Sequence, residues 1–247
     1  MTVQDDERER ELCRLFNLSW DSAHQRGGTD AFFSIDVYGD RYHVPVEVKS
    51  TTRETIATAR DVGMDHIAKW KKVMWIIGFY TQSRRPELIR MLCLTPADMS
   101  PWISEIEEKI GPDFLLAKLA SHRLTLNDLY EICGQKEHYK VADAKRLHKM
   151  QWSSEQYQAA RDILVGGEMM ISPQKMLDIL KLRAEYIANR GATLNNPHIT
   201  KTFLATFANT DRAVAQNGEP AVRVREITRN YIATAPTHPF IGQPLGQ

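Results

Sequence analysis

The spacing of apolar residues changes along the first hundred residues, and each change predicts a different element. Residues 5–17 are charged and carry apolar positions at helical spacing, which predicts a first helix. From Asp30 to Lys49 apolar residues recur at every second position, the pattern of half-buried strands. Two short apolar runs, 73–81 and 88–94, predict buried strands. The N-terminal part is therefore expected to be a small mixed sheet with helices.

The segment between Asp30 and Lys49 has the pattern of a β-hairpin. Its apolar residues fall on one face: Ala31, Phe33, Ile35, Val37, Tyr42, Val44, Val46 and Val48. The dipeptide Gly39-Asp40 suits a two-residue turn, which pairs Tyr38 with Arg41. Pro45 cannot donate to a strand ladder, so it implies an edge position, a bulge or a different register.

This register brings charged residues together on the other face, at the open end of the hairpin. Asp30 lies opposite Lys49 and Phe32 lies opposite Glu47, so the two carboxylates are diagonal neighbours about 7–8 Å apart. Paired carboxylates suit Mg²⁺, which prefers oxygen ligands and which the carbonyl of Val48 could also bind. A lysine beside them could orient the attacking water and stabilise charge on a phosphodiester in the transition state. The alternative is a solvated face of cross-strand ion pairs without chemistry.

The pattern beyond residue 50 is mostly helical. Residues 51–54 have the form of a capping box and predict a helix that continues to about Lys72. Further helices are expected at 98–110, 125–133, 141–150, 153–165 and 172–190. The last of these has Ser172 as its cap and Gly191 as its terminator. These patterns divide the chain into an α/β part at 1–112, a mostly helical part at 113–235 and a tail at 236–247.

The composition excludes several classes of protein. Of the 247 residues, 43% are hydrophobic and 26% are charged, as in ordinary globular chains. A net charge of +1 excludes a highly basic protein that coats nucleic acid, although residues 1–112 carry −3 and the remainder +4. The apolar runs are too short to span a membrane, the N-terminus lacks a signal core, and the three cysteines are widely spaced. We therefore expect a cytoplasmic protein with no membrane segment, and the absence of P-loop and dinucleotide motifs predicts no nucleotide cofactor.

The segment from Arg26 to Thr51 resembles the core of the PD-(D/E)xK nuclease superfamily, which includes many type II restriction endonucleases and the archaeal Holliday-junction resolvases. Asp30 matches the first acid of the family pattern, Glu47 the second and Lys49 the lysine. Thr29 stands where the family has a proline. The resemblance covers roughly residues 5–95 and says nothing specific about the rest of the chain.

The resemblance implies a fold, a cofactor and a reaction. The fold is α/β, a restriction-endonuclease-like mixed β-sheet core flanked by helices. The cofactor is Mg²⁺, bound by Asp30 and Glu47, and Lys49 would assist the attacking water in DNA hydrolysis that leaves a 5′-phosphate and a 3′-hydroxyl. The family also has a glutamate on its first helix, and either Glu9 or Glu11 could match it.

The segment after the core offers contacts to DNA. Five basic residues lie close together in it: Lys136, Lys140, Lys145, Arg146 and Lys149. Such a run can bind phosphates, although a solvated helix face has the same pattern. About 150 residues follow the core, as in restriction endonucleases, which suggests a homodimeric type II enzyme that cuts double-stranded DNA at a symmetric site. The alternatives are a junction resolvase or repair nuclease, and a non-catalytic DNA-binding protein with a nuclease-like fold.

Overall fold

The computed structural model describes residues 3–20 and 28–235 and divides the chain into two compact units. Of these residues, 3–20, 28–109 and 194–235 belong to unit 1, and 110–193 belong to unit 2. The boundary expected at residue 112 is close to the observed one, but residues 194–235, expected in the helical part, belong to unit 1. The expected tail at 236–247 lies outside the described residues.

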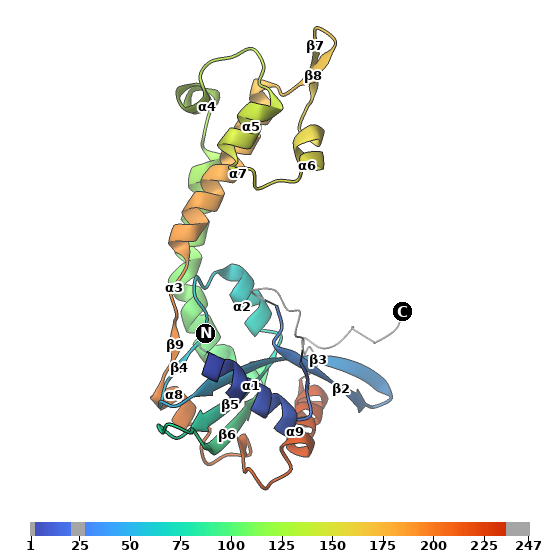
Figure 1. Cartoon of the computed structure of the whole chain (residues 1–247), viewed down its shortest axis with the longest axis vertical. Helices are drawn as coiled ribbons and strands as arrows, with labels where there is room; N and C mark the ends of the chain where they lie inside the picture. Colours follow the sequence, from blue (N-terminus) through green and yellow to red (C-terminus); the bar gives the residue numbers. More distant parts are fainter. Residues whose placement is uncertain (1–2, 21–27, 236–247) are drawn as a thin grey trace. The chain divides into compact units, whose positions relative to one another are not determined.

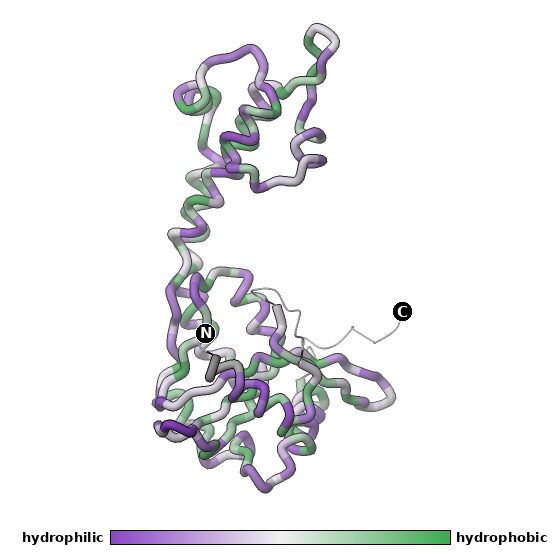
Figure 2. The backbone as a smooth tube through the Cα atoms, viewed as in Figure 1, coloured by the Kyte–Doolittle hydropathy of each residue, from purple (hydrophilic) through white to green (hydrophobic). Residues whose placement is uncertain are grey.

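Unit 1 is a mixed α/β structure around a six-stranded sheet (Figure 1). The strands, in their order across the sheet, are β1 (Ser19–Trp20), β2 (Ala31–Val37), β3 (Asp40–Thr51), β5 (Met74–Tyr80), β6 (Leu88–Leu94) and β10 (Ala213–Val214). The pair β3–β5 is parallel and the other neighbouring pairs are antiparallel. The expected mixed sheet and its two apolar strands are therefore confirmed. Every residue of β5 is buried, as its continuous apolar sequence predicts (Figure 2).

Helices cover both faces of this sheet. The helices of unit 1 are α1 (Val3–Leu15), α2 (Met64–Trp70), the first part of α3 (Pro96–His122), α8 (Lys201–Ala205) and α9 (Pro220–Thr234). α1 and α9 share one hydrophobic core with the apolar face of β2 and β3. Away from that core, the rings of Trp70 of α2, Trp75 of β5 and Trp102 of α3 pack in tilted or edge-on pairs, with centroids 5.2–6.0 Å apart. α2 is thereby held against β5.

The helix expected from residue 51 to about 72 is wrong over its first half. Thr51 is the last residue of β3, and its hydroxyl accepts from the amide of Arg53 and donates to the carbonyl of Thr55. These local bonds form a turn in place of a helix cap. The chain then forms β4 (Ile56–Ala57), which pairs with β9 (His198–Ile199), and only later enters α2. The partner strand comes from a segment about 140 residues away, which no local pattern can indicate.

The β2–β3 hairpin has the predicted faces but a different register. Its turn is at Tyr38-Gly39, so that Val37 pairs with Asp40 and Phe32 pairs with Pro45. The observed pairing differs from the expected one by two residues, and an even shift keeps every side chain on its face. The apolar residues of both strands are accordingly buried, with Tyr42 partly so. Pro45 lies at an edge, because β3 pairs with β5 only from Val46 onward.

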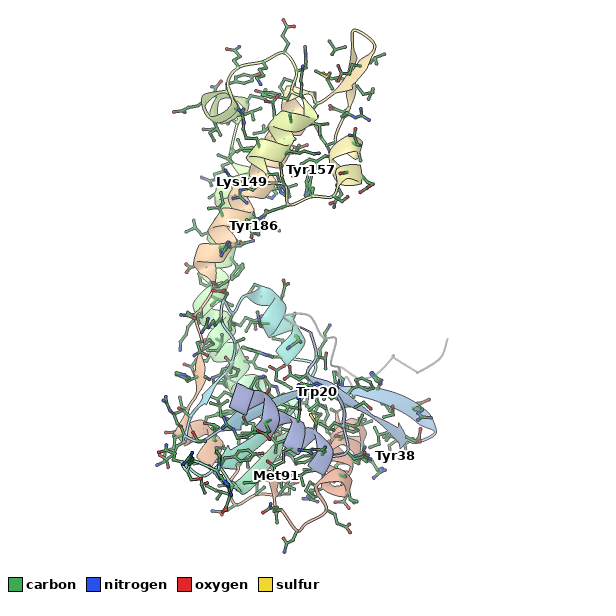
Figure 3. The ribbon with its side chains drawn as sticks, in the orientation of Figure 1. Trp20, Tyr38, Met91, Lys149, Tyr157 and Tyr186 are labelled. Atoms are coloured by element: carbon green, nitrogen blue, oxygen red, sulfur yellow. The ribbon has the colours of Figure 1, made fainter. Side chains whose placement is uncertain are left out.

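The observed turn lies one residue earlier than the expected one, and both of its central residues have left-handed backbone conformations. Tyr38 has φ 52° and Gly39 has φ 92°, the geometry of a hairpin turn that prefers Asn-Gly. Tyr38 lies at the tip of the hairpin (Figure 3) and is 86% exposed, so its side chain contributes little packing to offset this strain.

We expect Tyr38→Asn to raise the free energy of unfolding by about 1 kcal/mol, because asparagine tolerates the left-handed region. Gly39→Ala should lower it by about 1 kcal/mol for the opposite reason. Urea unfolding followed by tryptophan fluorescence measures both. Equal stability of the three proteins would contradict the observed turn.

Unit 2 is mostly helical, as expected, but contains a hairpin that the pattern does not predict. Its elements after α3 are α4 (Leu126–Cys133), α5 (Val141–Leu147), α6 (Ser154–Ala159), β7 (Ile163–Val165), β8 (Glu168–Met170) and α7 (Pro173–Ala192). The helix expected at 153–165 ends at Ala159, because the following apolar residues pair with β8 across Gly166-Gly167. Ser172 caps α7 as predicted, whereas the helix continues through Gly191 to Ala192. Within the described residues, no helix is long and apolar enough to cross a membrane.

Candidate functional site

The site forms where β3 extends beyond the start of β2. The two strands pair as far as Ala31 and Val46, and β3 then continues for five residues without this neighbour. Asp30 takes the place of the missing strand: its Oδ2 accepts a hydrogen bond of 2.9 Å from the amide of Val48. A buried amide must be satisfied, so this carboxylate completes the edge of the sheet.

The ammonium of Lys49 lies among the three oxygens that the sequence predicts as metal ligands. Its Nζ is 2.8 Å from Oε1 of Glu47, 3.2 Å from Oδ2 of Asp30 and 3.1 Å from the carbonyl oxygen of Val48. Glu47, Lys49 and Asp30 are only 3%, 7% and 9% exposed. The structure thus brings the predicted residues together, and their oxygens converge on one cation. Because Glu47 is nearly enclosed, the expectation of a solvated charged face does not describe this site.

A second lysine, which the sequence reasoning missed, completes the cluster. Lys69 of α2 lies 2.7 Å from Oε2 of Glu47 and donates a hydrogen bond of 2.9 Å to the carbonyl of Gly28. It therefore links Glu47 to the segment that leads into Asp30. Lys69 stands beside Lys71 and Lys72 in the sequence, and only the rotation of α2 against β5 decides which lysine faces inward. No signal in the sequence distinguishes the three.

The lysines control the ionisation of the buried carboxylate. Burial alone would raise the pKa of Glu47, but Lys49 and Lys69 outweigh it and lower this pKa to about 2. Burial would likewise lower the pKa of Lys49, whereas Glu47, Asp30 and Glu9 raise it well above its usual range. Glu47 is therefore a carboxylate and Lys49 an ammonium across the physiological pH range.

The two candidate helix glutamates have different environments. Glu9 is buried, and its charge helps to raise the pKa of Lys49. The pKa of Cys13 is raised to about 12, mainly by burial and further by the charges of Asp30 and Glu9. Glu11 accepts a hydrogen bond of 3.0 Å from the hydroxyl of Tyr80. Two residues along a helix place side chains on different faces, and it is the charge of Glu9 that acts on Lys49, whereas Glu11 bonds to Tyr80. The geometry therefore favours Glu9 as the match to the family glutamate.

The donor set fits a hard divalent cation. Mg²⁺ is commonly held by one or two carboxylates with water and substrate oxygens, and this site offers Asp30, Glu47 and the Val48 carbonyl. Over residues 3–20 and 28–235, no cluster of three or more His, Cys, Asp or Glu side chains is arranged to hold a metal. Around the ammonium of Lys49 the site has two acidic side chains and one main-chain oxygen. These are the oxygen ligands that the resemblance implies for Mg²⁺.

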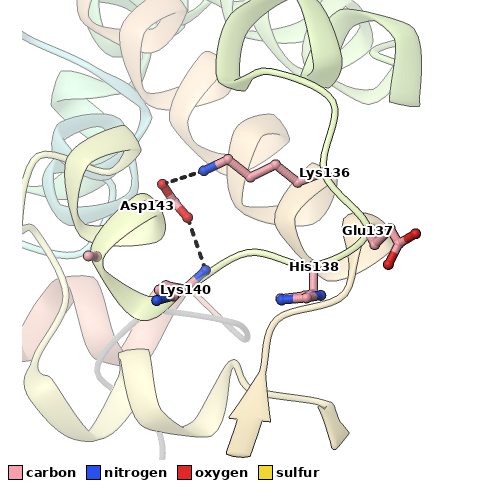
Figure 4. Close-up of a pocket in the computed structure, with 6 residues that line it drawn as sticks. Lys136, Glu137, His138, Lys140 and Asp143 are labelled. Atoms are coloured by element: carbon pink, nitrogen blue, oxygen red, sulfur yellow. Dashed lines mark hydrogen bonds and ion pairs between the residues drawn. The ribbon is translucent and has the colours of Figure 1, made fainter. Parts of the chain in front are cut away.

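The predicted basic run of unit 2 is partly neutralised. Lys136 Nζ lies 2.9 Å from Oδ1 of Asp143 (Figure 4). Arg146 lies 3.5 Å from the same atom. A hollow of about 440 Å³ lies here, lined by Lys136, Glu137, His138, Lys140, Ala142 and Asp143. Lys145 lies partly buried, 5.8 Å from the centre of the Tyr157 ring. Of the five predicted residues, Lys140 and Lys149 project into solvent without an ion pair among the described residues.

No protein-family model matches this sequence, and a search of the curated proteins finds no match. The family resemblance therefore depends on the motif residues and their geometry.

The depressed pKa of Glu47 predicts a pH-dependent stability in the absence of metal. A folded pKa of about 2 against an ordinary value of 4.5 means that the ionised carboxylate stabilises the fold above pH 4.5. This contribution, roughly 3 kcal/mol at neutral pH, is lost as the pH falls toward 2. Glu47→Gln should therefore be less stable than the natural chain at pH 7, with a difference that shrinks below pH 4.5. Urea unfolding in EDTA measures it.

Glu105→Gln is the matched control, because Glu105 lies exposed on α3 in an i,i+4 pair with Lys109. It should change stability by less than about 0.5 kcal/mol at either pH. A Glu47→Gln difference that stays constant between pH 7 and pH 3 would contradict the predicted ionisation.

Proposed function

We propose that this protein is a Mg²⁺-dependent endodeoxyribonuclease with a restriction-endonuclease-like core that hydrolyses phosphodiester bonds of double-stranded DNA. One observation carries the proposal: two buried carboxylates and one carbonyl oxygen converge on the ammonium of Lys49, where β3 extends past β2 in a mixed sheet. A cluster that served only stability would bury this much charge at high cost, because desolvation of ion pairs offsets most of their attraction. This cost supports a chemical role for the cluster.

Each residue of the site has a role that its position supports. Asp30, Glu47 and the carbonyl of Val48 would hold Mg²⁺, which when bound neutralises phosphate charge and acidifies water. Lys49 remains an ammonium, so it would orient the attacking water as a donor and stabilise charge on the phosphoryl oxygens. Lys69 would hold the carboxylate of Glu47 in place from the second helix.

The most specific form of the proposal is a homodimeric type II restriction enzyme. A two-fold symmetric protein can cut both strands of a symmetric site. The chain also carries a separate compact unit of 84 residues, 110–193, beyond its sheet-containing unit, which supports a function in DNA recognition. A junction resolvase or repair nuclease would share the active site, so the substrate preference separates them.

Asp30→Asn and Glu47→Gln should each reduce cleavage of plasmid DNA by at least about a hundredfold, because each removes a charged ligand of the metal. Lys49→Met should reduce it by about 10²–10³-fold, as expected when a fixed donor that stabilises charge in the transition state is removed. The assay is a plasmid digest in Mg²⁺ or EDTA with mapping of the ends, and Glu105→Gln should cut like the natural protein. Circular dichroism verifies that each variant folds.

The products decide between the alternatives. Discrete fragments with 5′-phosphates indicate a restriction enzyme, whereas preferential cutting of branched DNA indicates a resolvase. Binding of duplex DNA without cleavage at any Mg²⁺ concentration contradicts the proposal and indicates a non-catalytic DNA-binding protein.

The glutamates of α1 provide a separate test. Glu9→Gln should slow cleavage by about tenfold or more, because Glu9 faces the charged cluster. Glu11→Gln should leave the rate within about twofold, since glutamine can still accept the hydrogen bond from Tyr80. Initial rates at saturating Mg²⁺ measure both, and a larger effect at Glu11 would reverse the assignment.

A further inference from the structure

The order of elements in unit 2 forms a helix-turn-helix with an appended hairpin. α4 is followed by an extended segment at Tyr139, then by α5, a turn, α6 and the hairpin β7–β8. Tyr139 pairs with Ile171, directly after β8, through two hydrogen bonds of 2.8 and 3.0 Å between their main chains. The hairpin is thereby attached to the segment that begins α5. Together with α7, which contributes Met176, Leu177, Ile179 and Leu180, these helices form one core that a small antiparallel sheet closes.

The helices of this motif share one core. Tyr157 and Ala160 of the α6 region are buried together with Ala144 of α5 and Leu129 of α4. The ring of Tyr157 (Figure 3) lies on the side that faces α5. His148 and Lys145 lie against this ring. α6 is therefore held rigidly by one face.

The opposite face of α6 is exposed and polar. Ser154, Glu155, Gln158 and Ala159 lie on it, at the i, i+1, i+4 and i+5 spacing of one helix face. Gln156 is not available there, because its side chain accepts from the amide of Ser153 in a capping box. Glutamine reads adenine and glutamate reads cytosine in the major groove, and small residues let a helix approach the bases.

Basic residues flank α6. Residues 136–161 contain six Lys and Arg against three Asp and Glu, although the net charge of the whole chain is only +1. Lys140 at the start of α5 and Lys149 in the turn are exposed, and the side chain of Arg146 is 73% exposed. In a helix-turn-helix the first helix crosses the DNA backbone, so these side chains suit phosphate contacts.

The β7–β8 hairpin projects an apolar tip. Gly166 and Gly167 form its turn with positive φ, and Leu164, Val165 and Met169 are 69%, 37% and 39% exposed. Exposed leucine and methionine on a narrow hairpin are side chains that can contact or wedge into a minor groove.

We propose that unit 2 is a winged-helix module that reads duplex DNA, with α6 in the major groove, Glu155 and Gln158 contacting bases, and β7–β8 as the wing. The inference rests on the proposed function, since the DNA cleaved by unit 1 is the ligand of unit 2. It assigns sequence specificity to the exposed face of α6 and keeps Lys140 and Lys149 as phosphate contacts.

The test is selection of bound sequences from a pool of random DNA duplexes by the full chain in EDTA, where no cleavage occurs. The natural protein should enrich a defined motif. The double variant E155A/Q158A should lose about tenfold to a hundredfold of its preference at one or two base pairs of that motif. K140A/K149A should weaken binding to all duplexes alike and reduce its salt dependence. The matched control N127A/E131A alters an exposed amide and carboxylate of α4 and should leave the motif unchanged.

An unchanged motif in E155A/Q158A, or no binding of any duplex by the natural protein, overturns the inference. Failure of the proposed function has a different signature, because sequence-dependent binding then persists through α6 while Mg²⁺ produces no cleavage. Discrete cleavage with a motif insensitive to α6 supports the nuclease and removes the reading role of unit 2.

Discussion

The contact of the Lys49 ammonium with three oxygens is the interaction on which the site depends. It lies where a long central strand extends past its neighbour, and Asp30 satisfies both the buried amide of Val48, which has no strand partner there, and the lysine. Removal of one member would leave buried charge without compensation, which costs several kcal/mol. The oxygens of Asp30 and Glu47 are consequently held in one place by the same contacts that satisfy the edge of the sheet.

The rest of unit 1 serves to enclose this cluster. The apolar face of the β2–β3 hairpin packs with α1 and α9, and the charged residues of β3 lie on the opposite face. There the tryptophans of α2, β5 and α3 fix α2 close to the sheet, and this brings Lys69 to Glu47. Packing of aromatic rings therefore sets the electrostatics of the acid, since the second lysine helps to hold its pKa near 2.

The predictive power of the sequence was greatest where a pattern has a single structural consequence. Alternation over 31–48 determines the face of each residue, and an even register shift preserves that face, so the charged residues converged although the predicted turn was wrong. Continuous apolar runs likewise identified β5 and β6. The capping pattern at Thr51 failed because its hydroxyl has several backbone partners within reach, and a local pattern does not select among them.

Local patterns were sufficient to identify the acids, the lysine of β3 and the strands that carry them, because period-two spacing and the motif are properties of neighbouring residues. Tertiary packing was needed to bring Lys69 into the site, to let the charge of Glu9 act on Lys49, and to return residues 194–235 to the first unit. It also decided that α5, α6 and the β7–β8 hairpin form one motif, through the pairing of Tyr139 with Ile171. Each of these depends on the rotation of a helix or on contacts between distant segments, which burial of a shared core selects and local spacing does not encode.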